Sequence, residues 1–439
     1  MTTPRLLACL NGSPMGAVER DRSGRLRFVY EDAWRQRADA IPLSLSMPLT
    51  RGEYAHTTID AFLWGLLPDN EQTLSRWGRQ FQVSARNPFG LLTHIGEDCA
   101  GAVQFIPPER LASIQSDVRE DIAWLAESDI AERLQQLRSD PSATRRATDH
   151  GQFSLAGAQP KTALLLRDGR WGVPSGRVPT THILKPPTDA FDGHAENEHL
   201  CLSLARILGL PAARSTVHRF EGEPAIVVER FDRTIWQGQL LRVHQEDTCQ
   251  ALAVVPTRKY QSDGGPGPAA IIELLRTHSS AGREDVQRFV DALAFNWLIA
   301  GTDAHAKNYS LLLGSHGRVR LAPLYDLGSA LPYPGLRQDK LSMAMKIGHT
   351  YRLRDIRRHH WEKLLRELRL SAEETLADII AMAEALPDHA HAVARSMRES
   401  GLDHPILDAL PALLATSAIE KVQRLRDTTP HRPNPWPNP

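Results

Sequence analysis

The stretch from Phe295 to Leu331 constrains the fold of this chain most, because it sets three polar residues between apolar runs. Asp303 and Asn308 are five residues apart, and Asp326 lies eighteen residues further on. The alternating apolar segment at residues 319–321 predicts a short strand before the Gly-containing turn at Asp326. The spacing indicates a site that handles protons or metal ions and is laid out for phosphoryl transfer.

The same spacing is found in protein kinases. There an Asp accepts the proton of the substrate hydroxyl, an Asn five positions later holds magnesium, and an Asp before a Gly holds the metal that bridges the phosphates. Here the strings are D-A-H-A-K-N and D-L-G, without the H-R-D triplet of eukaryotic kinases. The motif by itself indicates a distant kinase. Clusters of Asp, His and Asn also cap helices and fill turns, and that interpretation stays open on these residues alone.

Length and composition are those of a soluble globular protein with two or three domains. The chain has 439 residues, of which 41% are hydrophobic and 24% charged, and its formal net charge is zero. A neutral chain has no global attraction to nucleic acid or anionic membranes. No apolar run approaches membrane-spanning length and no signal peptide is recognisable, so we expect a cytoplasmic protein without a membrane partner. The scattered cysteines are expected to be reduced and mostly buried: Cys9, Cys99, Cys201 and Cys249.

The first hundred residues are predicted to form a compact α+β module that ends at Pro107-Pro108. Strands are expected over residues 5–10, 15–20, 25–30, 41–49 and 101–106, and helices over residues 59–67 and 88–96. The prolines of the 41–49 segment place it at a sheet edge. An amphipathic helix with apolar positions from 122 to 137 and a mobile polar connection at 139–152 are expected to follow.

A small-residue turn and a strand lysine come next. The string FSLAGAQPKTALLL, from Phe153, joins the turn to an apolar strand, and its loop lets backbone N–H groups approach an anion, with Lys161 adding charge. The alternative is a hairpin turn with a solvated lysine, because neither the Walker A nor the G-x-G-x-x-G spacing is present. THILKPP then places Lys185 at the end of a strand over residues 181–184, where a kinase keeps the lysine that binds the ATP phosphates.

A helix over residues 195–208 is expected after Lys185, with two acidic residues in its first turn. Glu196 and Glu198 suit the positive end of the helix dipole, and that structural role is the default. Of the two, Glu198 is the one expected to steady Lys185. Two strands are then expected, over residues 215–220 and 225–231.

The second of these strands ends at Glu229 and Phe231, the point where a two-lobed kinase holds adenine. A transition-metal hydrolase site made by Asp303, His305 and Asp326 is an alternative. It leaves the downstream Asn and the upstream lysine without a task, and we therefore discount it.

The region after the second Asp is strongly helical in pattern. Helices are expected over residues 356–368, 372–385, 390–397 and 406–426. The Arg- and His-rich stretch 351–369 is interpreted as a solvated helix face, with contact to a partner or DNA as the alternative. Residues 430–439 are predicted to form a disordered tail.

The order of these parts resembles that of the HipA family of bacterial Ser/Thr kinases, the toxin halves of HipA–HipB toxin–antitoxin pairs. The resemblance is carried by FLWGLLPDNE, SLAGAQPKTAL, THILKP, the E-N-E helix, VERFDR, HQEDTCQ, GTDAHAKNYS and LAPLYDLGS, which together span nearly the whole chain. It implies an α+β, two-lobed protein-kinase-like fold with a mixed α/β N-terminal lobe and a helical C-terminal lobe. The implied units are residues 1–106 (N-terminal subdomain), 107–150 (helix and linker), 151–235 (ATP-binding part of the small lobe), 236–429 (catalytic lobe) and 430–439 (tail).

The resemblance also implies roles for individual residues. Asp303 becomes the catalytic base, and Asn308 and Asp326 become magnesium ligands, in keeping with the preference of magnesium for oxygen. The ATP-binding residues implied are Lys185, Glu229, Phe231, Ala156, Gly157 and Lys161. Within the catalytic loop, His305 and Lys307 either touch the transferred phosphate or make structural hydrogen bonds. Ser154 is the implied autophosphorylation site, and its phosphate would repel the nucleotide.

The implied activity is that of an ATP-dependent Ser/Thr protein kinase that acts as a toxin. Its implied partners are a HipB-like helix-turn-helix antitoxin, operator DNA reached through that antitoxin, and a protein substrate such as an aminoacyl-tRNA synthetase, whose phosphorylation arrests growth and favours persistence. The alternatives are a small-molecule kinase of similar architecture and a catalytically silent co-repressor. The intact set of Lys185, Asp303, Asn308 and Asp326 argues against a silent protein.

Overall fold

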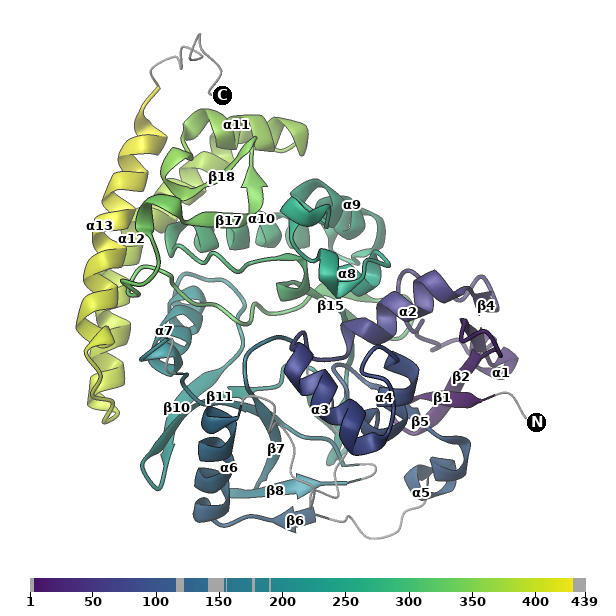
Figure 1. Cartoon of the computed structure of the whole chain (residues 1–439). Helices are drawn as coiled ribbons and strands as arrows, with labels where there is room; N and C mark the ends of the chain where they lie inside the picture. The colour runs from purple at the N-terminus through teal and green to yellow at the C-terminus, as the bar shows by residue number, and fades with distance from the viewer. Residues whose placement is uncertain are drawn as a thin grey trace.

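The computed structural model describes residues 4–115, 122–140, 154, 156–175, 178–188 and 191–428. In Figure 1 the purple and blue N-terminal domain and the teal small lobe lie below the green and yellow helical lobe. Of the mobile connection predicted over residues 139–152, Ser139 is the last residue of a helix, and residues 141–152 lie outside the described residues, as does the predicted tail at 430–439.

The N-terminal domain is built on a five-stranded antiparallel sheet in the order β4-β3-β2-β1-β5. Its strands are β1 (Arg5–Leu10), β2 (Ser13–Arg20), β3 (Leu26–Tyr30), β4 (Glu53–Tyr54) and β5 (Val103–Ile106). Its helices are α1 (Asp32–Arg35), α2 (His56–Gly65), α3 (Glu71–Phe81), α4 (Pro88–Ile95) and α5 (Leu111–Gln115), with a 3-10 turn at η1 (Pro108–Arg110). Buried aromatic rings such as Phe28, Phe62 and Phe105 fill the space between sheet and helices. The predicted antiparallel meander is confirmed.

The strand predicted over residues 41–49 is wrong. All of these residues are described, and their only ladder contact is an isolated bridge between Ser44 and Met47. The segment turns because Ser44 Oγ and the Leu45 N–H both bind the carboxylate of Glu246, on a distant strand. Its alternating apolar residues therefore reach the core from a turn. Helix α3 was not predicted, although Asn70 caps its first turn by accepting from the N–H groups of Gln72 and Thr73.

The small lobe contains a six-stranded antiparallel sheet in the order β10-β11-β9-β7-β8-β6. Its strands are β6 (Ile122–Trp124), β7 (Thr162–Arg167), β8 (Arg170–Pro174), β9 (His182–Lys185), β10 (Ser215–Phe220) and β11 (Glu223–Glu229). Helix α6 (Glu127–Ser139) packs Ile130 and Leu134 onto this sheet. Ile122 belongs to β6, so the predicted helix begins five residues later than its apolar pattern. Helix α7 (His194–Ile207) contacts β10 and β11 as well as the C-terminal helices.

The large lobe is mainly helical, as predicted. Its helices are α8 (Thr248–Ala251), α9 (Pro268–His278), α10 (Gly282–Leu298), α11 (Arg358–Glu367), α12 (Ala372–Glu399) and α13 (Ile406–Arg426). Its short sheets are β12 (Arg233–Trp236) with β13 (Gln239–Arg242), β14 (His244–Asp247) with β15 (Ser310–Leu313) and β16 (Val319–Leu321), and β17 (Ser342–Ile347) with β18 (Thr350–Arg352). Short 3-10 turns are η2 (Pro256–Arg258), η3 (Gln261–Asp263), η4 (Ala306–Asn308), η5 (Gln338–Lys340) and η6 (Leu353–Asp355).

The core of the large lobe packs around α10, the helix that precedes the loop with Asp303 and Asn308. Trp297, Phe289 and Phe295 of α10 are fully buried, and Trp297 packs edge-on against Trp361 of α11. The two helices predicted on either side of Pro387 are one continuous helix, α12. A proline inside a helix removes one backbone N–H donor, which weakens the helix locally. Because α13 packs along α12 (Figure 1), this packing compensates for the loss and the helix continues through Pro387.

The four cysteines are free and buried, as expected. Burial raises the pKa of the Cys9 thiol to about 12, so this thiol stays protonated at neutral pH. Within the described ranges, no helix is both long and apolar enough to cross a membrane.

Candidate active site

All the predicted site residues except Ser154 line one cavity of about 670 Å³ between the three parts of the molecule. Its wall includes Ala156, Gly157, Lys161, Lys185, Glu198, Glu229, Phe231, Asp303, His305, Lys307, Asn308 and Asp326. The fold thus brings together residues that are up to 170 positions apart in the sequence, from 156 to 326. Ser154, the predicted phosphorylation site, is not among the described residues that line the cavity.

Lys185 is the centre of an ion-pair triad. It is the last residue of β9 and pairs in register with Ile226 of β11, which fixes its backbone. Its Nζ donates to Glu198 Oε1 at 2.8 Å and to Asp326 Oδ1 at 2.6 Å. Burial by itself lowers the pKa of Lys185, but the carboxylates of Asp326 and Glu198 outweigh it and raise the pKa above its usual value. The cavity therefore holds a permanent cation. The choice of Glu198 as the partner of Lys185 is confirmed, although Glu196 is also buried.

Asp326 is held in an unusual backbone conformation. Its φ of 57° lies in the left-handed region, which costs a non-glycine residue about 1–3 kcal/mol when the surroundings enforce it. Burial works to raise its pKa, but Lys185 and Lys161 outweigh burial and hold the pKa far below its usual range. Asp326 therefore stays ionised. The preceding residue helps to fix it, because the Tyr325 hydroxyl donates to the backbone carbonyl of Lys307 at 2.6 Å.

Asp303 and Asn308 lie in one short loop after α10. Asn308 Nδ2 donates to the Asp303 carbonyl at 2.8 Å, which closes the loop and makes Oδ1 the ligand atom of that amide. The Tyr260 hydroxyl donates to Asp303 Oδ1 at 2.5 Å. The carboxylate of Asp303 is thus oriented by a residue from a different segment, the turn between η2 and η3.

His305 and Lys307 have different surroundings. Lys307 Nζ donates to the Gly65 carbonyl and to Asp247 Oδ2, both at 3.1 Å, so its contacts are structural hydrogen bonds. His305 packs edge-on against Tyr260, and within the described ranges its buried Nδ1 has no hydrogen-bond partner. Burial lowers the pKa of His305 even though Asp303 opposes it, and the ring is therefore neutral at pH 7.

The loop at residues 156–161 closes on its own lysine. Lys161 Nζ donates to the Ala156 carbonyl at 2.7 Å, and burial, reinforced by nearby Lys185, lowers its pKa to about 8. The interpretation of Lys161 as a solvated lysine is therefore wrong. Gly157 has a φ of 103°, and a Cβ there would lie 2.5 Å from Lys161 Nζ. The positive φ favours glycine at this position, and a side chain there would also require the flexible end of Lys161 to shift.

Ser154 is fully buried beside this loop. Its hydroxyl donates to the Leu66 carbonyl at 2.7 Å, and its backbone N–H donates to the Asp98 carbonyl at 3.0 Å. Both partners belong to the N-terminal domain. A phosphate on this oxygen would therefore have to displace the serine from its present position.

Glu229 ends β11 and Phe231 lies two residues after it, at the predicted adenine side of the cavity. The backbone N–H of Glu229 donates to the Arg214 carbonyl at 2.9 Å, and the Phe231 ring lies 5.6 Å from that of Tyr325. Both residues line the cavity, in keeping with the predicted location.

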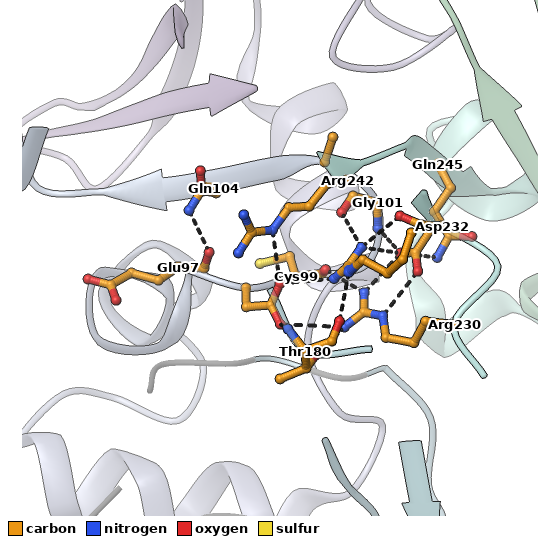
Figure 2. A network of polar contacts seen from close by, with 12 residues as sticks. Glu97, Cys99, Gly101, Gln104, Thr180, Arg230, Asp232, Arg242 and Gln245 are labelled. Atoms are coloured by element: carbon orange, nitrogen blue, oxygen red, sulfur yellow. Dashed lines mark hydrogen bonds and ion pairs between the residues drawn. The ribbon is translucent and has the colours of Figure 1, made fainter. Parts of the chain in front are cut away.

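The residues that alternate with them anchor this segment to the N-terminal domain. Figure 2 shows how Arg230, Asp232 and Arg242 gather with Thr180 and the backbone of Cys99 and Gly101. At the centre Asp98 accepts from Thr180, Arg233 and Arg242. Burial opposes its ionisation, but the arginines outweigh burial and hold its pKa far below the usual range. The sequence analysis did not anticipate this network, although Arg230, Asp232 and Arg233 stand in the VERFDR string.

The donor set of the cavity fits a magnesium ion. Asn308 Oδ1 and the Asp326 carboxylate are hard oxygen donors, which that ion prefers, and both residues line the cavity. In the described part of the chain, no three His, Cys, Asp or Glu residues are placed to hold a metal, and this includes the set Asp303, His305 and Asp326. The alternative of a transition-metal hydrolase site is therefore not supported.

Comparison with family models and related proteins agrees with this arrangement. The model of the HipA N-terminal domain matches residues 6–106, and that of the HipA-like C-terminal domain matches residues 153–390. "Putative kinase Y4mE" of Sinorhizobium fredii is 38% identical over 371 residues, which are 84% of this chain and 86% of the relative. "Serine/threonine-protein kinase toxin HipA" of Shewanella oneidensis is 29% identical over 376 residues, which are 82% of each chain.

A solved structure has the same fold over almost the whole chain. It is that of the Shewanella oneidensis MR-1 toxin–antitoxin system HipA, HipB and its operator DNA complex, and its matching chain gives a TM-score of 0.82 at 24% identity. The match covers 96% of this chain and 99% of the other, and it confirms the predicted α+β, two-lobed fold. The chain therefore belongs to the HipA family of kinases.

Proposed function

We propose that this chain is an ATP-dependent Ser/Thr protein kinase that acts as the toxin of a toxin–antitoxin pair. The observation that carries the proposal is the convergence of the Lys185, Glu198 and Asp326 triad with the Asp303 and Asn308 loop on one cavity. Phosphoryl transfer requires a fixed cation, oxygen ligands for a metal ion and an oriented carboxylate. Lys185, held by two carboxylates, is the cation. Asn308 and Asp326 offer the oxygen ligands, and Asp303 is the oriented carboxylate.

Each residue then has one task. When bound, magnesium-ATP would supply the phosphoryl group, and its magnesium ion would stabilise the negative charge on the phosphate oxygens. Asn308 and Asp326 would hold that ion. Lys185 would bind phosphate oxygens, the loop at 156–161 would cover the nucleotide, and Glu229 and Phe231 would lie beside adenine. Tyr260 donates to Oδ1 of Asp303 and makes that oxygen the less basic of the two, so Oδ2 would receive the proton of the substrate hydroxyl.

The first experiment is transfer of radiolabelled phosphate from ATP by the purified chain. We expect labelled protein from the parent and none from Asp303→Ala, with both proteins folded by circular dichroism. Equal labelling by the two proteins would remove Asp303 from its role. No labelling by the parent, with its own protein and with a cell lysate as acceptors, would favour the silent co-repressor.

A small-molecule kinase of similar architecture is the alternative with the same chemistry. Phosphoproteomes of cells with and without expression distinguish them, because a protein kinase adds protein phosphosites that its Asp303→Ala variant does not add. The same data would identify the substrate, for which an aminoacyl-tRNA synthetase is our proposal.

The proposed partner is a HipB-like helix-turn-helix antitoxin that carries the complex to operator DNA. The Shewanella oneidensis HipA was solved in such an assembly, with HipB and its operator DNA, and this supports the proposal. This chain has a formal net charge of zero, so it has little electrostatic reason to bind DNA phosphates alone. We expect no tight operator binding by the isolated chain at physiological salt, and a gel-shift assay with and without the antitoxin tests this.

A further inference from the structure

The N-terminal domain reaches the candidate active site through the short loop between α2 and α3. Asp69 lies in this loop, and its side chain is 11% exposed. Its Oδ2 is 2.7 Å from Lys259 Nζ, and its Oδ1 is 4.0 Å from Lys307 Nζ. The carboxylate therefore lies between two lysines of the large lobe, one before the catalytic loop and one within it.

The backbone around Asp69 holds a third segment. The Asp69 N–H donates to the Gly157 carbonyl at 3.3 Å, and Pro68 forms a parallel bridge with Gly157. Gly157 is the residue around which the 156–161 loop turns over Lys161. Asp69 thus contacts the nucleotide loop through its main chain and the catalytic region through its side chain.

The contact with Lys259 leads directly to the proposed base. The Lys259 carbonyl accepts the N–H of Ala306, in the catalytic loop, at 3.3 Å. The next residue, Tyr260, donates its hydroxyl hydrogen to Asp303 Oδ1. A shift of Lys259 would therefore move both the carboxylate of Asp303 and the loop that carries Asn308.

The charges in this cluster are balanced. Lys307 also binds Asp247, so the buried Lys307 and the half-buried Lys259 face two carboxylates. Burial by itself raises the pKa of Asp69, but Lys307 and Lys259 outweigh it and hold the pKa below its usual value. Asp69 therefore stays ionised, and replacing it by a neutral side chain would leave one lysine charge without compensation.

We infer that Asp69 is a positioning residue of the kinase, by which the N-terminal domain fixes the nucleotide loop and the catalytic loop relative to each other. The inference rests on the proposed function. Asp69 acts through Lys259 and Gly157. Through Asp69, the N-terminal domain would contribute to catalysis by positioning residues of the other two parts of the molecule.

The test is Asp69→Asn, which keeps the shape of the residue and removes the charge that anchors it to Lys259 and Lys307. We expect kcat of phosphoryl transfer to fall about ten- to a hundredfold, as misplacement of a reacting group by about 1 Å does, with KM for magnesium-ATP changed less than about threefold. Glu71→Gln is the matched control, because Glu71 is an exposed acidic residue two positions away in the first turn of α3. It should leave kcat unchanged.

A second variant tests the route and guards against misfolding. Lys259→Met removes the same ion pair from the other side, so it should lower kcat as Asp69→Asn does, and the double variant should be no worse than either single one. Additive losses would show two separate effects and contradict the route. If Asp69→Asn does not fold, Lys259→Met alone decides, and a kcat within twofold of the parent overturns the inference.

Hydrogen exchange separates this inference from the proposed function. Asp69→Asn should exchange faster than the parent at residues 156–161 and 303–308 together, whatever reaction the cavity performs. Unchanged exchange in both loops with an active parent would sink the inference and leave the kinase standing. Faster exchange of both loops in Asp69→Asn, together with a parent that transfers no phosphate, would support the positioning role of Asp69 and contradict the proposed kinase activity.

Discussion

The Tyr260 hydroxyl donates to Asp303 Oδ1 at 2.5 Å, across 43 positions of the sequence. The proposed base is therefore oriented before any substrate arrives. Tyr260 is itself steadied by the edge of the His305 ring and by the neighbouring Lys259 ammonium, 5.6 Å from its centroid. Two neighbours in the chain, Lys259 and Tyr260, thus connect Asp69 to Asp303.

The first prediction concerns this hydrogen bond. Tyr260→Phe keeps the ring and frees the carboxylate of Asp303 to rotate, so single-turnover autophosphorylation should slow roughly tenfold, with magnesium-ATP affinity retained. Tyr351→Phe is the control, because Tyr351 lies in β18, outside the residues of the cavity wall. A Tyr260→Phe rate equal to that of the parent would mean that this bond does not orient Asp303.

The second prediction separates the two acidic residues of the site. Asp326→Ala should abolish magnesium-dependent ATP binding, because a metal ligand acts in the ground-state complex. Asp303→Ala should leave binding largely intact and stop transfer, because a base acts mainly in the transition state. Isothermal titration calorimetry of both variants with magnesium-ATP measures this. Unaltered affinity in Asp326→Ala would refute the assignment of Asp326 to the metal.

The third prediction concerns stability and its dependence on pH. Asp98→Asn removes one of the two buried carboxylates that face Arg230, Arg233 and Arg242, and breaking such a group should cost about 3–5 kcal/mol of unfolding free energy at pH 7. The folded-state pKa of Asp98 is depressed, so its contribution is complete above the ordinary Asp pKa of about 4 and declines as pH falls below it.

Urea unfolding at pH 7 and at successively lower pH tests the direction in which the stabilisation by Asp98 changes with pH. The difference between the parent and Asp98→Asn should shrink as the pH falls below about 4. Asp39→Asn is the control, since Asp39 is exposed and paired with Arg37 at the surface, and it should leave stability unchanged. A difference that grows towards low pH would contradict the depressed pKa.

Local patterns in the sequence predicted most elements of this fold, because they depend on neighbours in the chain. The bounds of β1, β10, β16 and α13 agree with prediction, because the short β-like runs and the helical period of these segments depend on neighbouring residues alone. The 41–49 segment has a strand-like alternation too, but its backbone follows Ser44, which binds Glu246 across 202 positions. Local pattern carries no information on such a contact.

The candidate site likewise contains residues that the sequence predicted and residues that it did not. The order of motifs brought Lys185 and Glu198 together in prediction, and the structure joins them. Tyr260 and Asp69 were not predicted, because the contact of Asp69 with Lys259 spans 190 positions and depends on how a separate domain docks. A motif search finds the residues that contact the reactants more readily than those that position them.

The last prediction is that phosphorylation of Ser154 switches the kinase off. The Ser154 hydroxyl is buried and donates to the Leu66 carbonyl. A phosphate of about −1.5 to −2 charges on this oxygen would be repelled by that carbonyl and would not fit in the buried space. The serine would have to leave its place, and the adjoining loop with Gly157 would move with it. Parent protein, with its catalytic residues intact, should carry phosphate on Ser154 by mass spectrometry, and Asp303→Ala should not. Ser154→Asp should bind magnesium-ATP at least tenfold more weakly than the parent, whereas Ser154→Ala, which only loses the bond to Leu66, should retain binding. If Ser154→Asp binds as the parent does, the switch is wrong even where Ser154 is phosphorylated.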